Sequence, residues 1–94
     1  MEVFWRIKGR VQRVGFRRWA IAKALEIGGI SGYIHNDESG DVLVCIDGSE
    51  RCIYDFMQAC FKGPFFARVD EIINAPEIKT LFPPIENGVL KKFK

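Results

Sequence analysis

The arginines and glycines of residues 9–17, GRVQRVGFR, are the side chains whose types and spacing best suit chemistry in this sequence. A guanidinium can bind two oxygens of a phosphate at once, and glycine lets the backbone turn and approach a ligand closely. If a helix begins near Phe16, its unpaired N–H groups add donors that favour an anion. The segment therefore predicts a cradle for a tetrahedral anion, with Arg17 binding the phosphoryl oxygens. The alternative is a solvated basic loop without a ligand.

Asn36 is the second candidate, because it ends a row of residues on one side of the strand-like segment ISGYIHN. Ile30, Gly32 and Ile34 precede it on that side, which must face the core. An amide at the end of this row could hold a water molecule or the anion, although asparagine also serves as a plain turn residue. His35 falls on the opposite side, and we expect it to be an exposed surface residue and not a general base.

Hydrophobic periodicity predicts the elements that position these residues. A period of two predicts a strand over residues 2–8, and helical spacing then predicts a helix over residues 16–27 with Ile21, Ala24 and Leu25 on its apolar stripe. A second amphipathic helix, capped by Ser49, carries Phe61 at the end of its apolar face. The other predictions are strands over residues 30–36 and 40–47 with a turn at 37–40, a strand over residues 66–73, and a short last strand within residues 88–94.

The resulting order, β-α-β-β-α-β, predicts an α+β fold of the ferredoxin-like, split-βαβ kind. In this fold two helices cover one face of an antiparallel sheet. The first helix is a crossover, so the first two strands run in the same direction and end at the same edge of the sheet. The arginine-rich loop and Asn36 are therefore expected to meet there. We expect residues 1–94 to form a single domain.

Composition narrows the function classes. A net charge of +2 is too small to indicate a nucleic-acid partner, and no segment resembles a signal peptide or a membrane span, so we expect a cytoplasmic protein. We also expect this protein to be a monomer. The three cysteines have no C-x-x-C spacing, so neither a disulfide framework nor a zinc site is predicted, and we interpret them as reduced structural thiols. The acidic residues Asp41, Asp47, Asp70 and Glu71 form no obvious metal-binding set. The terminal KKFK is interpreted as a solvated end.

Two motifs carry a resemblance to a known family. GRVQRVGFR resembles the acylphosphatase signature Gly-Arg-Val-Gln-Gly-Val-x-Phe-Arg, and SGYIHNDESGDV resembles the second motif of that family, Gly-Trp/Tyr-Val-x-Asn-x-x-x-Gly-x-Val. The spacing between the motifs also agrees. The resemblance covers about residues 3–75.

The resemblance implies hydrolysis of small acyl phosphates to a carboxylate and orthophosphate, without metal or cofactor. It assigns phosphate binding to Arg17 together with the loop amides, and orientation of the attacking water to Asn36. The phosphate-binding loop would comprise Arg10, Val11, Gln12, Arg13, Val14, Gly15 and Phe16.

The sequence departs from the family pattern at two positions. Arg13 stands where the signature has its internal glycine, so a positive φ there would strain the loop, while its charge would favour the anion. Asp37 follows Asn36 where threonine is common, and we expect its carboxylate to act against phosphate. The alternative function is a non-catalytic anion- or RNA-binding module on the same scaffold, with Tyr33 and His35 on the outer face of the sheet.

Overall fold

The elements of the computed structural model, which describes residues 1–93, follow the predicted order as far as β4. Helix α1 begins and ends at the predicted residues, and α2 is capped by Ser49, whose Oγ accepts a hydrogen bond from the Cys52 amide at 3.1 Å. The elements are β1 (Glu2–Arg10), α1 (Phe16–Ile27), β2 (Ser31–Asn36), β3 (Val42–Asp47), α2 (Glu50–Lys62), β4 (Arg68–Asn74), the 3-10 helix η1 (Pro76–Leu81) and β5 (Leu90–Lys92).

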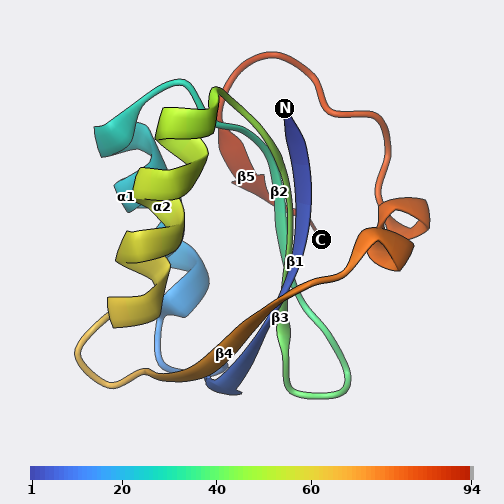
Figure 1. Ribbon diagram of the computed structural model, residues 1–94. Coiled ribbons are helices and arrows are strands. Elements are labelled where there is room, and N and C mark those ends of the chain that lie inside the picture. Colours follow the sequence, from blue (N-terminus) through green and yellow to red (C-terminus); the bar gives the residue numbers. More distant parts are fainter. Residues whose placement is uncertain (94) are drawn as a thin grey trace.

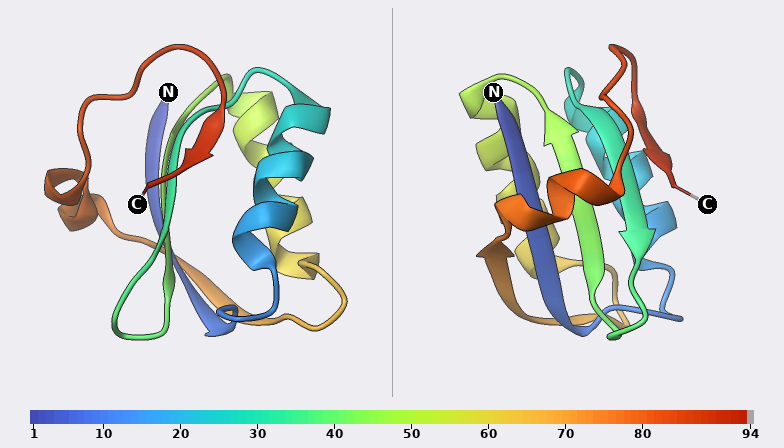
Figure 2. Two further views of the ribbon diagram at one scale, coloured as in Figure 1. Left: turned by 180° about the vertical axis from the view of Figure 1, so that it is seen from behind. Right: turned by 90° about the vertical axis from the view of Figure 1, so that its right-hand side faces the viewer.

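The sheet has the strand order β4-β1-β3-β2-β5. Its first four strands are antiparallel neighbours, as predicted, but β5 runs parallel to β2. The difference arises because the chain leaves β4 at one edge, crosses the face opposite the helices through η1, and reaches the far edge in the direction of β2 (Figures 1 and 2). The predicted fold class is confirmed, and β5 adds a parallel edge strand whose direction the sequence did not predict.

Helices α1 and α2 lie side by side on one face of the sheet, and the main core lies beneath them (Figure 1). Trp5 of β1 stacks on Phe56 of α2 with 6.1 Å between the ring centroids. Two predicted core residues lie outside it: Leu25 is 67% exposed and Phe61 is 46% exposed. Each stands at the margin of its helix's apolar stripe, which the sheet does not reach.

The opposite face of the sheet is covered as well. Leu43 packs with η1 in a second small cluster, and Tyr33 stacks on Phe82 with their rings 6.0 Å apart. Phe93 packs edge-on against Tyr33 and His35, and its backbone oxygen lies 2.8 Å from His35 Nδ1. His35 is therefore half-buried and not an exposed surface residue, because the C-terminal segment packs on it. Within the terminal KKFK, which was expected to be a solvated end, Lys91 and Lys92 are exposed and Phe93 is half-buried, and the last residue lies outside the described residues.

The cysteines are free thiols. Burial raises the pKa of Cys45 to about 11 and that of Cys60 to about 12, so both stay protonated near neutral pH. This agrees with the interpretation of reduced structural residues. Within residues 1–93, no helix has the length and apolar character that crossing a membrane requires.

Gly32 provides a stability test of the contact between β2 and β3. A Cβ atom there would lie 2.1 Å from the backbone oxygen of Cys45, at a φ of +142°. We expect Gly32→Ala to lower the free energy of unfolding by more than about 3 kcal/mol, measured by urea denaturation. Gly40→Ala is the matched control, because Gly40 also has a positive φ of +98° but an added Cβ would meet no atom within 4 Å. The control should lose only about 1 kcal/mol, and equal losses in the two variants would contradict the steric cause.

Candidate functional site

Strand pairing brings the two sequence motifs to one edge of the sheet. Val42 of β3 pairs with Ile7 of β1 on one side and with Asn36 of β2 on the other. Strands β1 and β2 therefore end at the same edge, where the β1–α1 loop and the β2–β3 hairpin lie together at the bottom of Figure 1. This is the meeting predicted from the topology.

A pocket of about 510 Å³ opens at this edge, within the size range of small-molecule sites. Arg17 of α1 and Asn36 of β2 both line it. Among residues 1–93, the charged side chains that line it are all cationic, and none is a carboxylate. The lining residues are Val11, Arg13, Gly15, Phe16, Arg17, Arg18, Ile21, Asn36 and Lys92.

The N-terminus of α1 adds backbone donors to the pocket. No side chain caps this helix, and its first hydrogen bond runs from the Trp19 amide to the Gly15 oxygen at 3.0 Å. Within residues 1–93, the amides of residues 12–15 donate no hydrogen bond to a backbone oxygen. Gly15 adopts a left-handed conformation with a φ of +77°, which turns the chain into the helix. Free amides and the positive end of the helix dipole together favour an anion here.

Arg13 adopts a φ of +62°, the one positive φ among the non-glycine residues that the structure describes. The position therefore has the backbone conformation that favours glycine, and an L side chain there costs about 1–2 kcal/mol. Its guanidinium is exposed and lines the pocket. The chain thus keeps a strained backbone at a position where the side chain adds a positive charge to the pocket.

The other residues of the predicted phosphate-binding loop differ in whether they face the core, the pocket or solvent. Val11 and Phe16 are buried and line the pocket. Val14 is half-buried against the main core, whereas Arg10 is exposed at the end of β1 and does not line the pocket. The predicted loop is therefore only partly pocket lining, because its side chains alternate between the core, solvent and the pocket.

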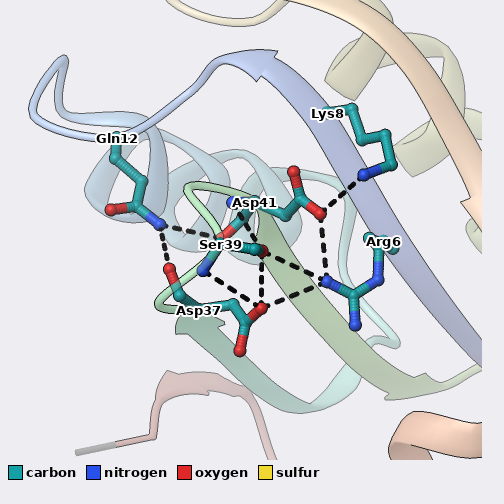
Figure 3. Close-up of polar contacts among 6 residues, drawn as sticks. All are labelled: Arg6, Lys8, Gln12, Asp37, Ser39 and Asp41. Atoms are coloured by element: carbon teal, nitrogen blue, oxygen red, sulfur yellow. Dashed lines mark hydrogen bonds and ion pairs between the residues drawn. The ribbon is translucent and has the colours of Figure 1, made fainter.

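Gln12 has a role that the sequence did not reveal. Its Nε2 donates to the backbone oxygens of Asp37 at 2.7 Å and Asp41 at 2.9 Å, which ties the β1–α1 loop to the β2–β3 hairpin (Figure 3). Asn36 directly precedes Asp37, so this clamp holds both sides of the pocket in one arrangement. The glutamine within the signature-like segment was the only sequence signal for it.

The Asp37 side chain lies in a polar cluster with Ser39 and Arg6. Its Oδ2 accepts hydrogen bonds from Ser39 Oγ at 2.6 Å and from Arg6 Nη1 at 3.1 Å, and Asp37 does not line the pocket (Figure 3). Asp41 Oδ2 accepts from Arg6 at 3.0 Å and from Lys8 Nζ at 2.9 Å. The expectation that Asp37 acts against a bound anion is therefore wrong, because its carboxylate pairs with Arg6 of β1 and does not line the pocket.

The electrostatics of this cluster keep its carboxylates ionised. The hydrogen bond from Ser39, followed by the contact with Arg6, lowers the pKa of Asp37 below its ordinary value of 3.8. Burial acts to raise the pKa of Asp41, but Lys8 and Arg6 outweigh it and the pKa is lowered. Stability from this cluster is present above pH 3.8 and is lost as the pH falls below that value. The hairpin therefore stays clamped at neutral pH.

Asn36 shows an unusual polar environment. Its Oδ1 is buried and has no hydrogen-bond partner within residues 1–93. A buried acceptor in this state costs about 1–3 kcal/mol. An amide oxygen can only accept a hydrogen bond, and the oxygens of a phosphate dianion cannot donate one. A water molecule next to Asn36 would satisfy this atom.

The sequence analysis missed three of the residues that line the pocket, namely Arg18, Ile21 and Lys92. Arg18 follows Arg17 directly, and the pair of arginines was the available signal. Lys92 lies in β5, where it pairs with Ile34 of β2. No local pattern could reveal Lys92, because only the register of β5 against β2 brings it to the pocket.

Comparison with known proteins shows which proteins this chain resembles in sequence and structure. A family model described as Acylphosphatase matches residues 3–81. An acylphosphatase of Nitrobacter winogradskyi is 40% identical over 82 residues, covering 87% of this chain and 82% of that protein. An acylphosphatase of Aliivibrio fischeri is 46% identical over 66 residues, covering 70% of this chain and 72% of its own. The crystal structure of acylphosphatase from Bacillus subtilis matches with a TM-score of 0.73 at 29% identity, covering 77% of this chain and 79% of that one.

Arg13 allows backbone strain and side-chain charge to be separated. Arg13→Gly removes both the charge and the strain, whereas Arg13→Ala removes the charge and keeps a Cβ at the positive φ. We expect the glycine variant to be about 1 kcal/mol more stable to urea than the alanine variant. Equal free energies of unfolding for the two variants would show that the loop relaxes and stores no strain.

Proposed function

This chain belongs to the acylphosphatase family, and from this premise we propose that it hydrolyses acyl phosphates at the pocket lined by Arg17 and Asn36. Its substrates are small acyl phosphates, and its products are a carboxylate and orthophosphate. The observation that carries the assignment to this pocket is that Arg17 and Asn36, one from each motif, line the same cavity.

Arg17 is proposed to anchor the phosphoryl group. It is half-buried at the first turn of α1, next to the uncapped helix N-terminus and the free amides of the loop. A planar guanidinium can donate to two phosphoryl oxygens while the loop amides donate to the third. Donors that are aimed before the reaction stabilise charge that develops on these oxygens, and phosphoryl transfer depends mainly on such positioning.

Asn36 is proposed to orient the attacking water, whose proton its buried Oδ1 can accept in a hydrogen bond. The water oxygen attacks phosphorus, and the bond between phosphorus and the acyl oxygen breaks. The carboxylate leaves with the electron pair of that bond, and the second proton of the water passes to a phosphoryl oxygen. An acyl phosphate dianion and water thus yield a carboxylate and dihydrogen phosphate, with charge and atoms balanced.

A strong general base is not required in this scheme, because a carboxylate is a good leaving group and a phosphoryl oxygen takes the proton. His35 is not available for the role, since its ring contacts Phe93 and it does not line the pocket. Loop positioning and the buried acceptor of Asn36 supply what the reaction needs.

The alternative of a non-catalytic RNA-binding module is not favoured. RNA-recognition modules of this topology use an open outer sheet face with aromatic side chains. Here Tyr33 stacks on Phe82, and η1 together with the C-terminal segment covers that face. A monomeric state and a cytoplasmic location remain predictions from the sequence.

Arg17 provides the first test of the proposal. The wild-type protein should release orthophosphate from acetyl phosphate in a saturable manner without added metal, and Arg17→Ala should abolish measurable turnover while the circular dichroism spectrum is retained. Arg17→Lys should not restore full activity, because a point charge cannot reproduce a two-pronged donor. A lysine variant with wild-type kcat/KM would show that the fork is not used.

Asn36 provides the second test. Asn36→Ala should lower kcat by at least about a hundredfold, the scale observed when a pre-aimed polar group is removed. Competitive inhibition by phosphate should persist, because Asn36 is proposed to hold water and not the anion. Loss of phosphate inhibition in parallel with turnover would instead make Asn36 an anion-binding residue.

A further inference from the structure

The pocket carries more positive charge than the phosphoryl group of an acyl phosphate can neutralise. Among the described residues, four cations line it, namely Arg13, Arg17, Arg18 and Lys92. A phosphoryl group bears about two negative charges near neutral pH. When Arg17 binds that group, three cations remain around the same cavity.

These three cations have no carboxylate partner among the described residues. The ion pairs of β1 use Arg6 and Lys8 on the other side of the sheet, and no acidic residue lines the pocket. Like charges gathered without a counter-charge repel one another. At Arg13 the chain keeps the charge in a strained backbone conformation. A second anion in the pocket would relieve this repulsion.

Lys92 and Arg18 reach the pocket from two different elements that pack against each other. Strand β5 lies beside α1 (Figure 2), and Lys92 pairs with Ile34 of β2. Side chains of paired residues point to the same face of a sheet, and Ile34 is buried in the core beneath the helices. Arg18 stands three residues before Ile21, so both lie on neighbouring parts of the surface of α1. Lys92 and Arg18 are exposed, which places them at the mouth and not at the bottom of the pocket.

We infer that Arg18 and Lys92, helped by Arg13, form a second oxyanion-binding subsite, and that the preferred substrates are acyl phosphates whose acyl part carries a further carboxylate or phosphate group. This inference rests on the proposed function, because it assigns the first subsite to the phosphoryl group held by Arg17. A volume of about 510 Å³ leaves room for an acyl group larger than acetyl beside the phosphoryl group.

The kinetic test compares acetyl phosphate with succinyl phosphate, whose acyl part ends in a carboxylate. The wild-type protein should hydrolyse succinyl phosphate with a kcat/KM at least about fivefold higher at low salt, and the preference should shrink in 0.5 M NaCl because the added ions screen the subsite. Arg18→Gln and Lys92→Gln should each lower this preference about threefold. Equal kcat/KM for the two substrates at low salt would overturn the inference.

Lys91→Gln is the matched control. It removes the same charge from the neighbouring residue of β5, but Lys91 lies over the Tyr33 ring and next to Glu86, and it does not line the pocket. This variant should keep the wild-type substrate preference. A loss of preference equal to that in Lys92→Gln would show that overall protein charge, and not a subsite, attracts the second anion.

A binding measurement separates failure of this inference from failure of the proposed function. By calorimetry, phosphonoacetate and methylenediphosphonate, which carry two anionic groups, should bind at least about fivefold more tightly than methylphosphonate, and the two probes distinguish a carboxylate from a phosphate as the second group. If neither acyl phosphate is hydrolysed, the proposed function fails, and the binding ratio still tests the subsite. If acetyl phosphate is hydrolysed but methylphosphonate binds as tightly as both probes with two anionic groups, the function stands and the subsite is wrong.

Discussion

The pairing of β1 and β2 with opposite sides of β3 is the constraint on which the site depends. Val42 faces Ile7 on one side and Asn36 on the other, so two segments far apart in sequence end at one edge of the sheet. The clamp from Gln12 to the backbone of Asp37 and Asp41 then holds the loop against the hairpin. A pocket that uses one motif from each segment can exist only because these pairings fix their separation.

The sheet also separates two kinds of charge. On its outer side, Arg6 and Lys8 are neutralised by Asp37 and Asp41, which stabilises the hairpin at neutral pH. Around the pocket, the cations have no carboxylate partner within residues 1–93, and the uncapped start of α1 adds unpaired amides. Two consecutive residues show this separation of charge: Asn36 lines the pocket, whereas the Asp37 side chain points away and binds Arg6 of β1. The cations that stabilise the hairpin therefore differ from those that line the pocket, so the pocket cations stay free to bind an anion.

Much of this arrangement could be predicted from local sequence. Helical spacing correctly placed α1 at Phe16–Ile27, and Ser49 correctly marked the start of α2, because periodicity and capping depend on near neighbours in the chain. Strand alternation also placed Ile34 in the core. The errors occur where burial depends on a distant segment. Leu25 has helical spacing but no sheet beneath it, and His35 is half-buried because Phe93 folds back onto it.

The sequence by itself determined the motifs, their helix and strand context, and their convergence on one edge of the sheet. These follow from side-chain period and from the handedness of the crossover, which act over short stretches of chain. Only the tertiary structure decided which charges are neutralised and which remain for a ligand. Asp37 pairs with Arg6 and does not face the ligand, and Lys92 lines the pocket because β5 pairs with β2 in this register. The physical reason is that an ion pair or a pocket lining depends on distances between segments that no local pattern specifies.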